Sequence, residues 1–184
     1  MKPLIIVFAC VLFVVTACNV STPKEESVPA VTASEAPAEK APIEFAPSKY
    51  SDVCKSSLAG LSSGNIDAFV KDMSENCVYR FNSGDSIAGK AAITKYWTDR
   101  RKNVIDKINF SDEIWLPLNV NENNPDDVRR GTWVLSWFTT SATYKSGKSM
   151  TQSIHTLFHF NDSEQIDEVI QYLDRASINA ASKK

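Results

Sequence analysis

Apolar residues recur at helical spacing in three stretches of the chain, at about residues 48–61, 65–73 and 89–108. This period predicts three amphipathic helices. Ser48 and Asn65 are placed to cap the first two helices, because their side chains can accept hydrogen bonds from free backbone N–H groups. The apolar stripe of the third helix includes Trp97, and Arg100 occupies a position on the same stripe.

After residue 108 the pattern changes to that of strands, at about residues 109–120, 128–144, 149–160 and 165–174, and an earlier β-rich stretch covers residues 77–81. Turn sequences at residues 145–148 and 161–164 join the last three strands as hairpins. Helices gathered ahead of long antiparallel strands predict an α+β fold rather than a parallel sheet.

The first 17 residues have the features of a secretory signal peptide. A short charged start precedes an almost unbroken apolar run at residues 4–15, which is too short to span a bilayer as a helix. Residues 15–18 resemble the lipobox of bacterial lipoproteins, in which the cysteine is lipidated, and an ordinary cleaved signal is the alternative. The resemblance implies that Cys18 carries acyl chains such as palmitate and anchors the protein in the bacterial cell envelope. By resemblance to the sorting of enterobacterial lipoproteins, Asn19 in place of aspartate argues against retention in the inner membrane and so implies the outer membrane.

Residues 18–47 differ in composition, because they hold most of the prolines of the chain and few aromatic residues. Such a segment cannot bury enough apolar surface to fold, so we expect a disordered tether. Residues 48–184 have the length of one domain. Basic and acidic residues are equal in number there, which argues against a nucleic-acid binder. The absence of a glycine-rich phosphate loop and of a histidine cluster predicts no cofactor and no metal.

Cys54 and Cys77 are the side-chain thiols that remain after processing at Cys18. An even pair in an oxidising compartment favours a disulfide. The alternative is two reduced thiols in the core, since free cysteine is among the most buried residue types. Neither cysteine has a histidine or second cysteine at ligand spacing, so zinc binding and thiol catalysis are not expected.

The hairpin turns decide which strand residues share a face of the sheet. With two-residue turns at residues 146–147 and 162–163, Phe138 pairs with His155, and His155 pairs with Ile170. One face then mixes apolar and polar side chains: Val134, Ser136, Phe138, Ser153, His155, His159, Glu168, Ile170, Tyr172 and Asp174. The other face is more apolar. We expect one face to line the interior beneath the helices and the other to meet a second subunit or more of the chain.

Over about residues 50–174 the chain resembles the SnoaL-like proteins of the nuclear transport factor 2-like superfamily. The resemblance is carried by the order and spacing of residues 61–69, of Gly89 with Ile93 and Trp97, and of residues 161–166 with 172–174. It implies a cone, in which a curved antiparallel sheet wraps around three N-terminal helices and encloses a pocket, and often a homodimer through the outer sheet face. The superfamily includes isomerases, cyclases and dehydratases besides pocket proteins, so the fold does not choose a function.

The mixed face is the first candidate site, because small-molecule pockets combine an apolar lining with a few polar groups. His155 or Asp174 would act there as general acid or base, and Tyr172 would donate a hydrogen bond to a developing oxyanion. Phe138 and His159 would contact the ligand. The alternative is that both histidines are structural and that Asp174 caps backbone groups at a strand end.

Arg100 and Trp97 form the second candidate site. A guanidinium on an apolar stripe can bind a ligand carboxylate, stack on the indole of Trp97 or extend to the rim of the helix. Two functions stay open: a membrane-tethered protein that binds a small, mostly apolar molecule, and an isomerase, cyclase or dehydratase that uses His155 or Asp174. Binding is favoured, because no acid–base pair is fixed at catalytic spacing.

Overall fold

The computed structural model describes residues 40–126 and 129–183. The predicted signal peptide, the lipidation site at Cys18 and most of the predicted tether lie outside these residues, so they remain predictions. Within the described ranges no helix is both long enough and apolar enough to cross a membrane.

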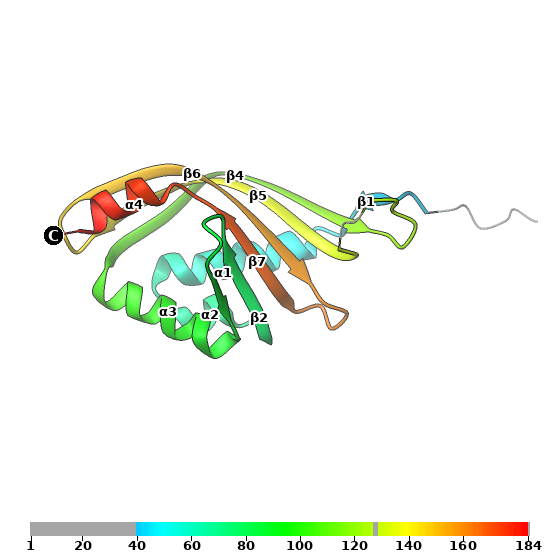
Figure 1. Ribbon diagram of the computed structural model, residues 1–184, viewed down its shortest axis with the longest axis horizontal. Helices are drawn as coiled ribbons and strands as arrows, with labels where there is room; N and C mark the ends of the chain where they lie inside the picture. The colour runs from blue at the N-terminus through cyan, green and yellow to red at the C-terminus, as the bar shows by residue number, and fades with distance from the viewer. Residues whose placement is uncertain (1–39, 127–128, 184) are drawn as a thin grey trace, which may run out of the picture. The chain divides into compact units, whose positions relative to one another are not determined.

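One seven-stranded sheet, with strand order β1-β4-β5-β6-β7-β2-β3, runs through the described part of the chain. Its strands are β1 (Ile43–Phe45), β2 (Met73–Phe81), β3 (Ser86–Ala88), β4 (Ile105–Val120), β5 (Gly131–Tyr144), β6 (Ser149–Phe160) and β7 (Ile166–Tyr172). Neighbouring strands are antiparallel except for β2 and β7, which run parallel. The curved, unclosed sheet confirms the predicted α+β class and adds one parallel pair (Figure 1).

The helices of the described residues are α1 (Lys49–Ser63), α2 (Ile66–Val70), α3 (Lys90–Asn103) and α4 (Arg175–Ser182). The sheet arches over α1, α2 and α3, which confirms the prediction of three helices beneath a curved sheet (Figure 1). The C-terminal helix α4 is not among the predicted helices. Its apolar residues are mostly alanines, so its stripe is weak in the sequence.

The junction of α1 and α2 depends on two glycines and one asparagine. Gly64 ends α1 with a left-handed φ of 82°, and Asn65 then accepts a hydrogen bond from the backbone N–H of Ala68 at 3.0 Å, as a helix cap does. A Cβ atom on Gly60 would lie 2.5 Å from the backbone nitrogen of Phe69. Glycine at position 60 therefore lets the two helices pack closely. The side chain of Ser48 makes no capping bond, so only the prediction for Asn65 is confirmed.

Two elements differ in extent from the prediction. Helix α3 ends at Asn103, because the β-branched residues Val104 and Ile105 lead into β4, where Ile108 pairs with Ala142. Strand β1 lies within the segment predicted to be a tether and pairs with the end of β4. The chain thus joins the sheet before residue 48.

The turn between β5 and β6 contains three residues, 145–147, rather than two, because Tyr144 pairs with Lys148. The backbone N–H of Tyr144 donates to the carbonyl of Lys148 at 2.9 Å, and Gly147 has a left-handed φ of 87°. As a result Trp137 pairs with His155, and the predicted pairing of Phe138 with His155 is wrong. A shift of one residue turns every side chain of β5 to the opposite face of the sheet.

The turn between β6 and β7 also contains three residues, 162–164, because the backbone N–H of Asn161 donates to the carbonyl of Gln165, and Glu164 has a φ of 58° at the third position. Together with a register shift between His159 and Phe160, this loop pairs His155 with Tyr172 instead of Ile170. A shift of two residues leaves each side chain on its own face. The histidines and Tyr172 therefore stay on one face, as predicted, although their partners differ.

The concave face of the sheet packs on the helices and forms most of the core. Its fully buried side chains include Val134, Phe158 and Val169, which pack with Phe69 and Ile93 from the helices, and Phe138, which packs with Leu58 from α1. The outer face carries Trp133, Trp137, His155, His159 and Tyr172. The face predicted to line the interior is thus split between the two sides of the sheet.

Candidate functional site

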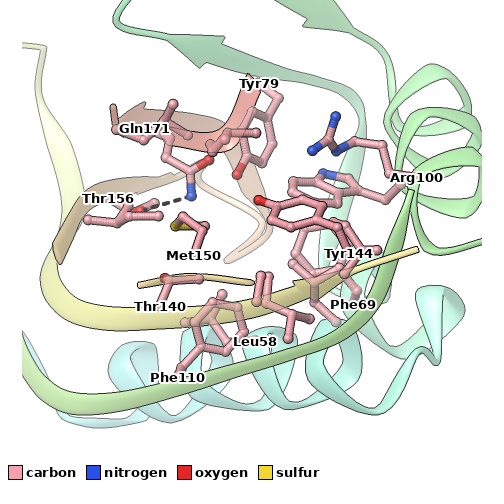
Figure 2. Close-up of a pocket in the computed structure, with 18 of the residues that line it drawn as sticks. Leu58, Phe69, Tyr79, Arg100, Phe110, Thr140, Tyr144, Met150, Thr156 and Gln171 are labelled. Carbon is pink, nitrogen blue, oxygen red and sulfur yellow. Dashed lines mark hydrogen bonds between the residues drawn. The ribbon is translucent and has the colours of Figure 1, made fainter. Parts of the chain in front are cut away.

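A cavity lies between the concave face of the sheet and the helices (Figure 2). Most of its lining is apolar and includes Leu58, Leu61, Phe110, Met150, Ile154 and Phe158. The polar part of the lining consists of Tyr79, Arg100, Thr140, Tyr144, Thr156 and Gln171, with the indole of Trp97. The centres of water-sized molecules can occupy about 50 Å³ of this inner cavity. An adjoining cavity between α3 and α4 offers about 100 Å³ more and shares Arg100 with the first.

Arg100, Tyr79 and Tyr144 bring three polar groups to the same part of the inner cavity (Figure 2). The guanidinium Cζ of Arg100 lies 5.5 Å from the ring centroid of Tyr96, so Arg100 stacks on Tyr96 rather than on Trp97. Burial raises the pKa of Tyr79 and of Tyr144, and the positive charge of Arg100 opposes the shift at each of them. Both phenols therefore stay protonated and can donate hydrogen bonds.

Two other polar atoms of the lining have no hydrogen-bond partner among the described residues. Gln171 donates from Nε2 to Thr156 Oγ1 at 3.4 Å, the dashed line in Figure 2. Thr140 Oγ1 and Trp97 Nε1, by contrast, are buried without a hydrogen-bond partner among the described residues. Because buried polar groups usually have a partner, these two atoms mark positions where a ligand or a water molecule can bond.

The inner cavity offers few means of acid–base catalysis. Over the described residues its lining holds no aspartate, glutamate, histidine or cysteine. The same part of the chain has no group of three such residues that could hold a metal ion. The lining is therefore suited to binding through apolar contacts, hydrogen-bond donors and one positive charge.

His155, Tyr172 and Asp174 lie together, but on the outer side of the sheet. With Trp137 they line an open hollow. The imidazole of His155 stacks between Trp137, with ring centroids 4.5 Å apart, and Tyr172, at 5.8 Å, and its Nδ1 lies 2.9 Å from the carbonyl oxygen of Ser136. The predicted site residues thus divide into an outer group and the inner pair of Trp97 and Arg100.

Asp174 caps helix α4. Its carboxylate accepts from the backbone N–H of Ala176 at 2.8 Å and from the hydroxyl of Ser177 at 2.6 Å. The bond from Ser177, and then the bond from Ala176, lowers the pKa of Asp174. A carboxylate stabilised in this way is a weak base near neutral pH. The geometry matches the structural alternative, in which Asp174 caps backbone groups.

His159 is buried in a network of charges on the outer side. Its Nδ1 lies 2.5 Å from Asp167 Oδ1, and its Nε2 lies 2.9 Å from the carbonyl oxygen of Arg130. Arg129 bonds to both Asp167 and Glu168. Since both ring nitrogens have partners within the protein, His159 has no free nitrogen for a ligand.

Phe138 and the two cysteines belong to the core. Phe138 packs with Leu58 and Ile154 beside the inner cavity without lining it. Cys54 and Cys77 are free, buried thiols, so the predicted disulfide is contradicted and the alternative of two reduced core thiols holds. Burial raises the pKa of Cys77 to about 12 and that of Cys54 well above its ordinary value. Each thiol packs as a small apolar group.

Tyr79, Tyr144 and Gln171 are cavity residues that the sequence did not single out. Tyr79 sits between the buried residues Cys77 and Phe81, and this alternation could have placed it on the inner face. The facing of Tyr144 depends on the three-residue loop beside it, which the sequence did not reveal. Gln171 alternates with the buried residue Val169 on β7, and this alternation could have placed it on the inner face.

No family model and no curated protein matches the chain. Solved structures do match. An NTF2-like protein of unknown function from Burkholderia pseudomallei K96243 has a TM-score of 0.58 at 10% identity, over 75% of this chain and 100% of that one. A protein with a ketosteroid isomerase-like fold from Catenulispora acidiphila DSM 44928, in complex with trimethylamine, has a TM-score of 0.53 at 15% identity, over 71% and 92%.

TerC, co-crystallised with polyporic acid, has a TM-score of 0.55 at 14% identity, over 73% of this chain and 98% of that one. Identities this low bear on the arrangement of helices and strands and not on chemistry. The comparisons and the curved sheet over three helices together show that this chain has the fold of the NTF2-like proteins.

Proposed function

We propose that the domain binds a small, mostly apolar molecule in the inner cavity. One observation carries this proposal: the cavity has an apolar lining in which the polar atoms Trp97 Nε1 and Thr140 Oγ1 lack a partner among the described residues. Small-molecule sites combine these two features. Two structures with the same fold contain small molecules, trimethylamine in one and polyporic acid in the other.

The free space limits the size of this molecule. The inner cavity and the adjoining cavity offer about 50 Å³ and about 100 Å³ for the centres of water-sized molecules. The two cavities share Trp97, Arg100 and Gln171, so a ligand can extend from one into the other. A single ring or a short chain fits this space better than a large polycyclic molecule.

An isomerase, cyclase or dehydratase is the alternative, and one observation favours it. His155, Tyr172 and Asp174 line the same outer hollow, and His155 Nε2 has no hydrogen bond within the described part of the chain. Against it, the hollow is open to water, which weakens electrostatic catalysis, and Asp174 is held as a helix cap. Binding in the inner cavity is therefore the better-supported function.

A cavity-filling variant tests the proposal. Ala142 lines the inner cavity, whereas its neighbour Ser141 points to the outer side of β5. Ala142→Leu should weaken the binding of 4-methylbenzamide or 4-methylbenzoate, measured by calorimetry, at least about tenfold, because the leucine occupies the ligand's space. Ser141→Leu, the matched control, should leave both affinities unchanged. Equal affinities in the two variants, or no binding to the wild-type protein, would contradict the proposal.

We also propose that the protein is held at a bacterial membrane, in the outer membrane, through lipid on Cys18. The motif at residues 15–18 supports this anchor, because its resemblance to a lipobox implies acyl chains on Cys18. Stable anchoring requires two or more such chains. Cys18→Ser should release the protein into the soluble fraction of the cells. A mutant that stays tightly bound to membranes would overturn the anchor and leave the cavity proposal untouched.

The outer face supports a proposed homodimer. Ile114, Trp137 and Tyr172 are 61%, 39% and 49% exposed, which is high for large apolar side chains on a sheet. Sedimentation of the soluble domain should show a dimer that Trp137→Lys dissociates. A monomer at every concentration would rule out this assembly.

A further inference from the structure

We propose that the molecule bound in the inner cavity is a small organic acid, and that Arg100 binds its carboxylate with the hydroxyls of Tyr79 and Tyr144. This inference rests on the proposed function, since it assigns a chemical class to the ligand of the same cavity. Three observations on the described residues support it: a guanidinium without an oxygen partner, a lining without a carboxylate, and several groups that can donate hydrogen bonds.

Arg100 has no oxygen partner among the described residues. Every other described arginine bonds to a carboxylate or a carbonyl, as Arg80 does to Glu168 and Arg101 does to the carbonyls of Ser62 and Asp106. The contact of Arg100 is with the ring of Tyr96, at 5.5 Å from its centroid. A guanidinium that is partly withdrawn from water without an anion is unfavourable, so its position favours an anionic ligand.

The walls around Arg100 carry no compensating charge. Over the described residues, neither the inner cavity nor the adjoining one is lined by an aspartate or a glutamate. A second arginine, Arg175, lines the adjoining cavity, and its partner Asp85 lies at the surface rather than in the lining. The end of the cavity between α3 and α4 is therefore positive, which complements a negative ligand.

Several polar groups of the cavity lining can donate hydrogen bonds. The hydroxyls of Tyr79 and Tyr144 point into the cavity on the same side as the guanidinium (Figure 2). All three residues line the same cavity. Trp97 is 93% buried, because its exposed fraction is 7%, and its unpartnered Nε1 can only donate. A carboxylate is the group that accepts from several donors at once and matches a guanidinium in a bidentate pair.

The remainder of the ligand must be apolar and short. Leu58, Leu61, Phe110 and Met150 line the rest of the inner cavity, whose free space is small. A monocyclic aromatic acid and a short aliphatic acid both satisfy these conditions. Their shared chemistry is a single carboxylate on a compact apolar body.

Matched probes test the inference on the soluble domain. 4-Methylbenzoate and hexanoate carry the carboxylate, and 4-methylbenzamide has the shape of the aromatic acid without the charge. Calorimetry should show that wild-type protein binds 4-methylbenzoate about tenfold more tightly than the amide, the size expected for a charge-assisted hydrogen bond. Hexanoate decides whether the apolar body must be a ring.

Variants then assign the effect to Arg100. Arg100→Gln should remove the preference for the acid and leave the affinity for the amide within about twofold, while Arg100→Lys should keep part of the preference. Tyr79→Phe should weaken acid binding several-fold, because it removes a donor. Arg101→Gln is the control, since Arg101 bonds to backbone carbonyls and does not line the cavity. Far-UV circular dichroism checks that each variant is folded.

The outcomes separate the two proposals. If the amide binds as tightly as the acid, or if Arg100→Gln leaves the acid affinity unchanged, the assignment of an acid is overturned and binding in the cavity stands. If no probe binds, or if Ala142→Leu changes no affinity, both proposals fail.

Discussion

Polar residues lie on both sides of the sheet, but the two sides differ in whether these residues have hydrogen-bond partners. On the inner side, the polar atoms Trp97 Nε1 and Thr140 Oγ1 and the guanidinium of Arg100 lack hydrogen-bond partners within the described residues. On the outer side, His159 and Asp174 already bond to groups of the protein. Polar residues that lie close together therefore do not by themselves make a site. Unsatisfied groups in an enclosed space are better evidence for a proposed site, because they gain a partner when a ligand binds.

The largest difference between the two sides should appear in stability. Ile166 and Ile170 both lie in β7, but Ile166 is fully buried in the core, while Ile170 is partly exposed on the outer face. Ile166→Ala should lower the free energy of unfolding by about 2–5 kcal/mol, because it leaves a cavity in the core. Ile170→Ala, the same chemical change, should cost less than half as much. Urea denaturation of both variants measures the contrast, and equal losses would mean that the outer face is covered by something else.

The second-largest loss of stability should come from breaking the charge network of His159, Asp167, Arg129 and Glu168 on the outer side. Asp167 bonds to both His159 and Arg129, and its side chain is 14% exposed. Asp167→Ala should cost about 2 kcal/mol, because it leaves a nearly buried imidazole without its acceptor and removes one of the two carboxylates that bond to Arg129. Asp162→Ala, at an exposed position nearby, should change the free energy of unfolding by less than about 0.5 kcal/mol. Chemical denaturation compares the two, and a similar small effect of both would show that the network is not structural.

The sequence predicted the helices and strands better than the site, because helices and strands are indicated by local sequence patterns and the site is not. Periodicity along residues 90–103 and alternation in the long strands are local, so the helix and the strands could be predicted from them. The facing of Phe138 and Tyr144 depends on one extra residue in the loop at residues 145–147, and two-residue and three-residue loops have similar sequences there. A single residue in that loop decided which face lined the cavity.

The sequence could identify Arg100 as a cavity residue, and it could nearly identify Tyr79. The catalytic roles of His155 and Asp174 remain predictions, and neither residue lies in an enclosed cavity. A charge on an apolar helical stripe is unusual in any fold, so Arg100 was visible in the sequence. Histidine and aspartate attract notice because they often catalyse reactions, but their role depends on burial and on partners, which only three-dimensional packing supplies. Helix α4, which provides the partners of Asp174, had no strong signal of its own.

The next comparison concerns ligand binding directly. His155 lies in the outer hollow and Arg100 in the inner cavity. His155→Ala should cost about 1 kcal/mol of stability, because it removes a ring stacked between Trp137 and Tyr172. It should change the affinity for 4-methylbenzoate less than about twofold, since the hollow and the cavity are on opposite sides of the sheet. Calorimetry on His155→Ala beside Arg100→Gln measures both, and a strong loss of binding in His155→Ala would move the site to the outer side.

The smallest effect should come from the cap of α4. Asp174→Ala removes the acceptor for Ala176 and Ser177 and should lower the melting temperature by about 2 °C at pH 7. The hydrogen bonds from Ser177 and Ala176 hold the pKa of Asp174 below its ordinary value of 3.8. A lowered pKa in the folded state means that the ionised carboxylate stabilises the fold above pH 3.8 and that this stabilisation is lost as the pH falls through the lower, folded value. The melting temperatures of wild type and Asp174→Ala should therefore converge below about pH 4, and a difference that stays constant down to pH 2.5 would show that the charge of Asp174 does not matter to the cap.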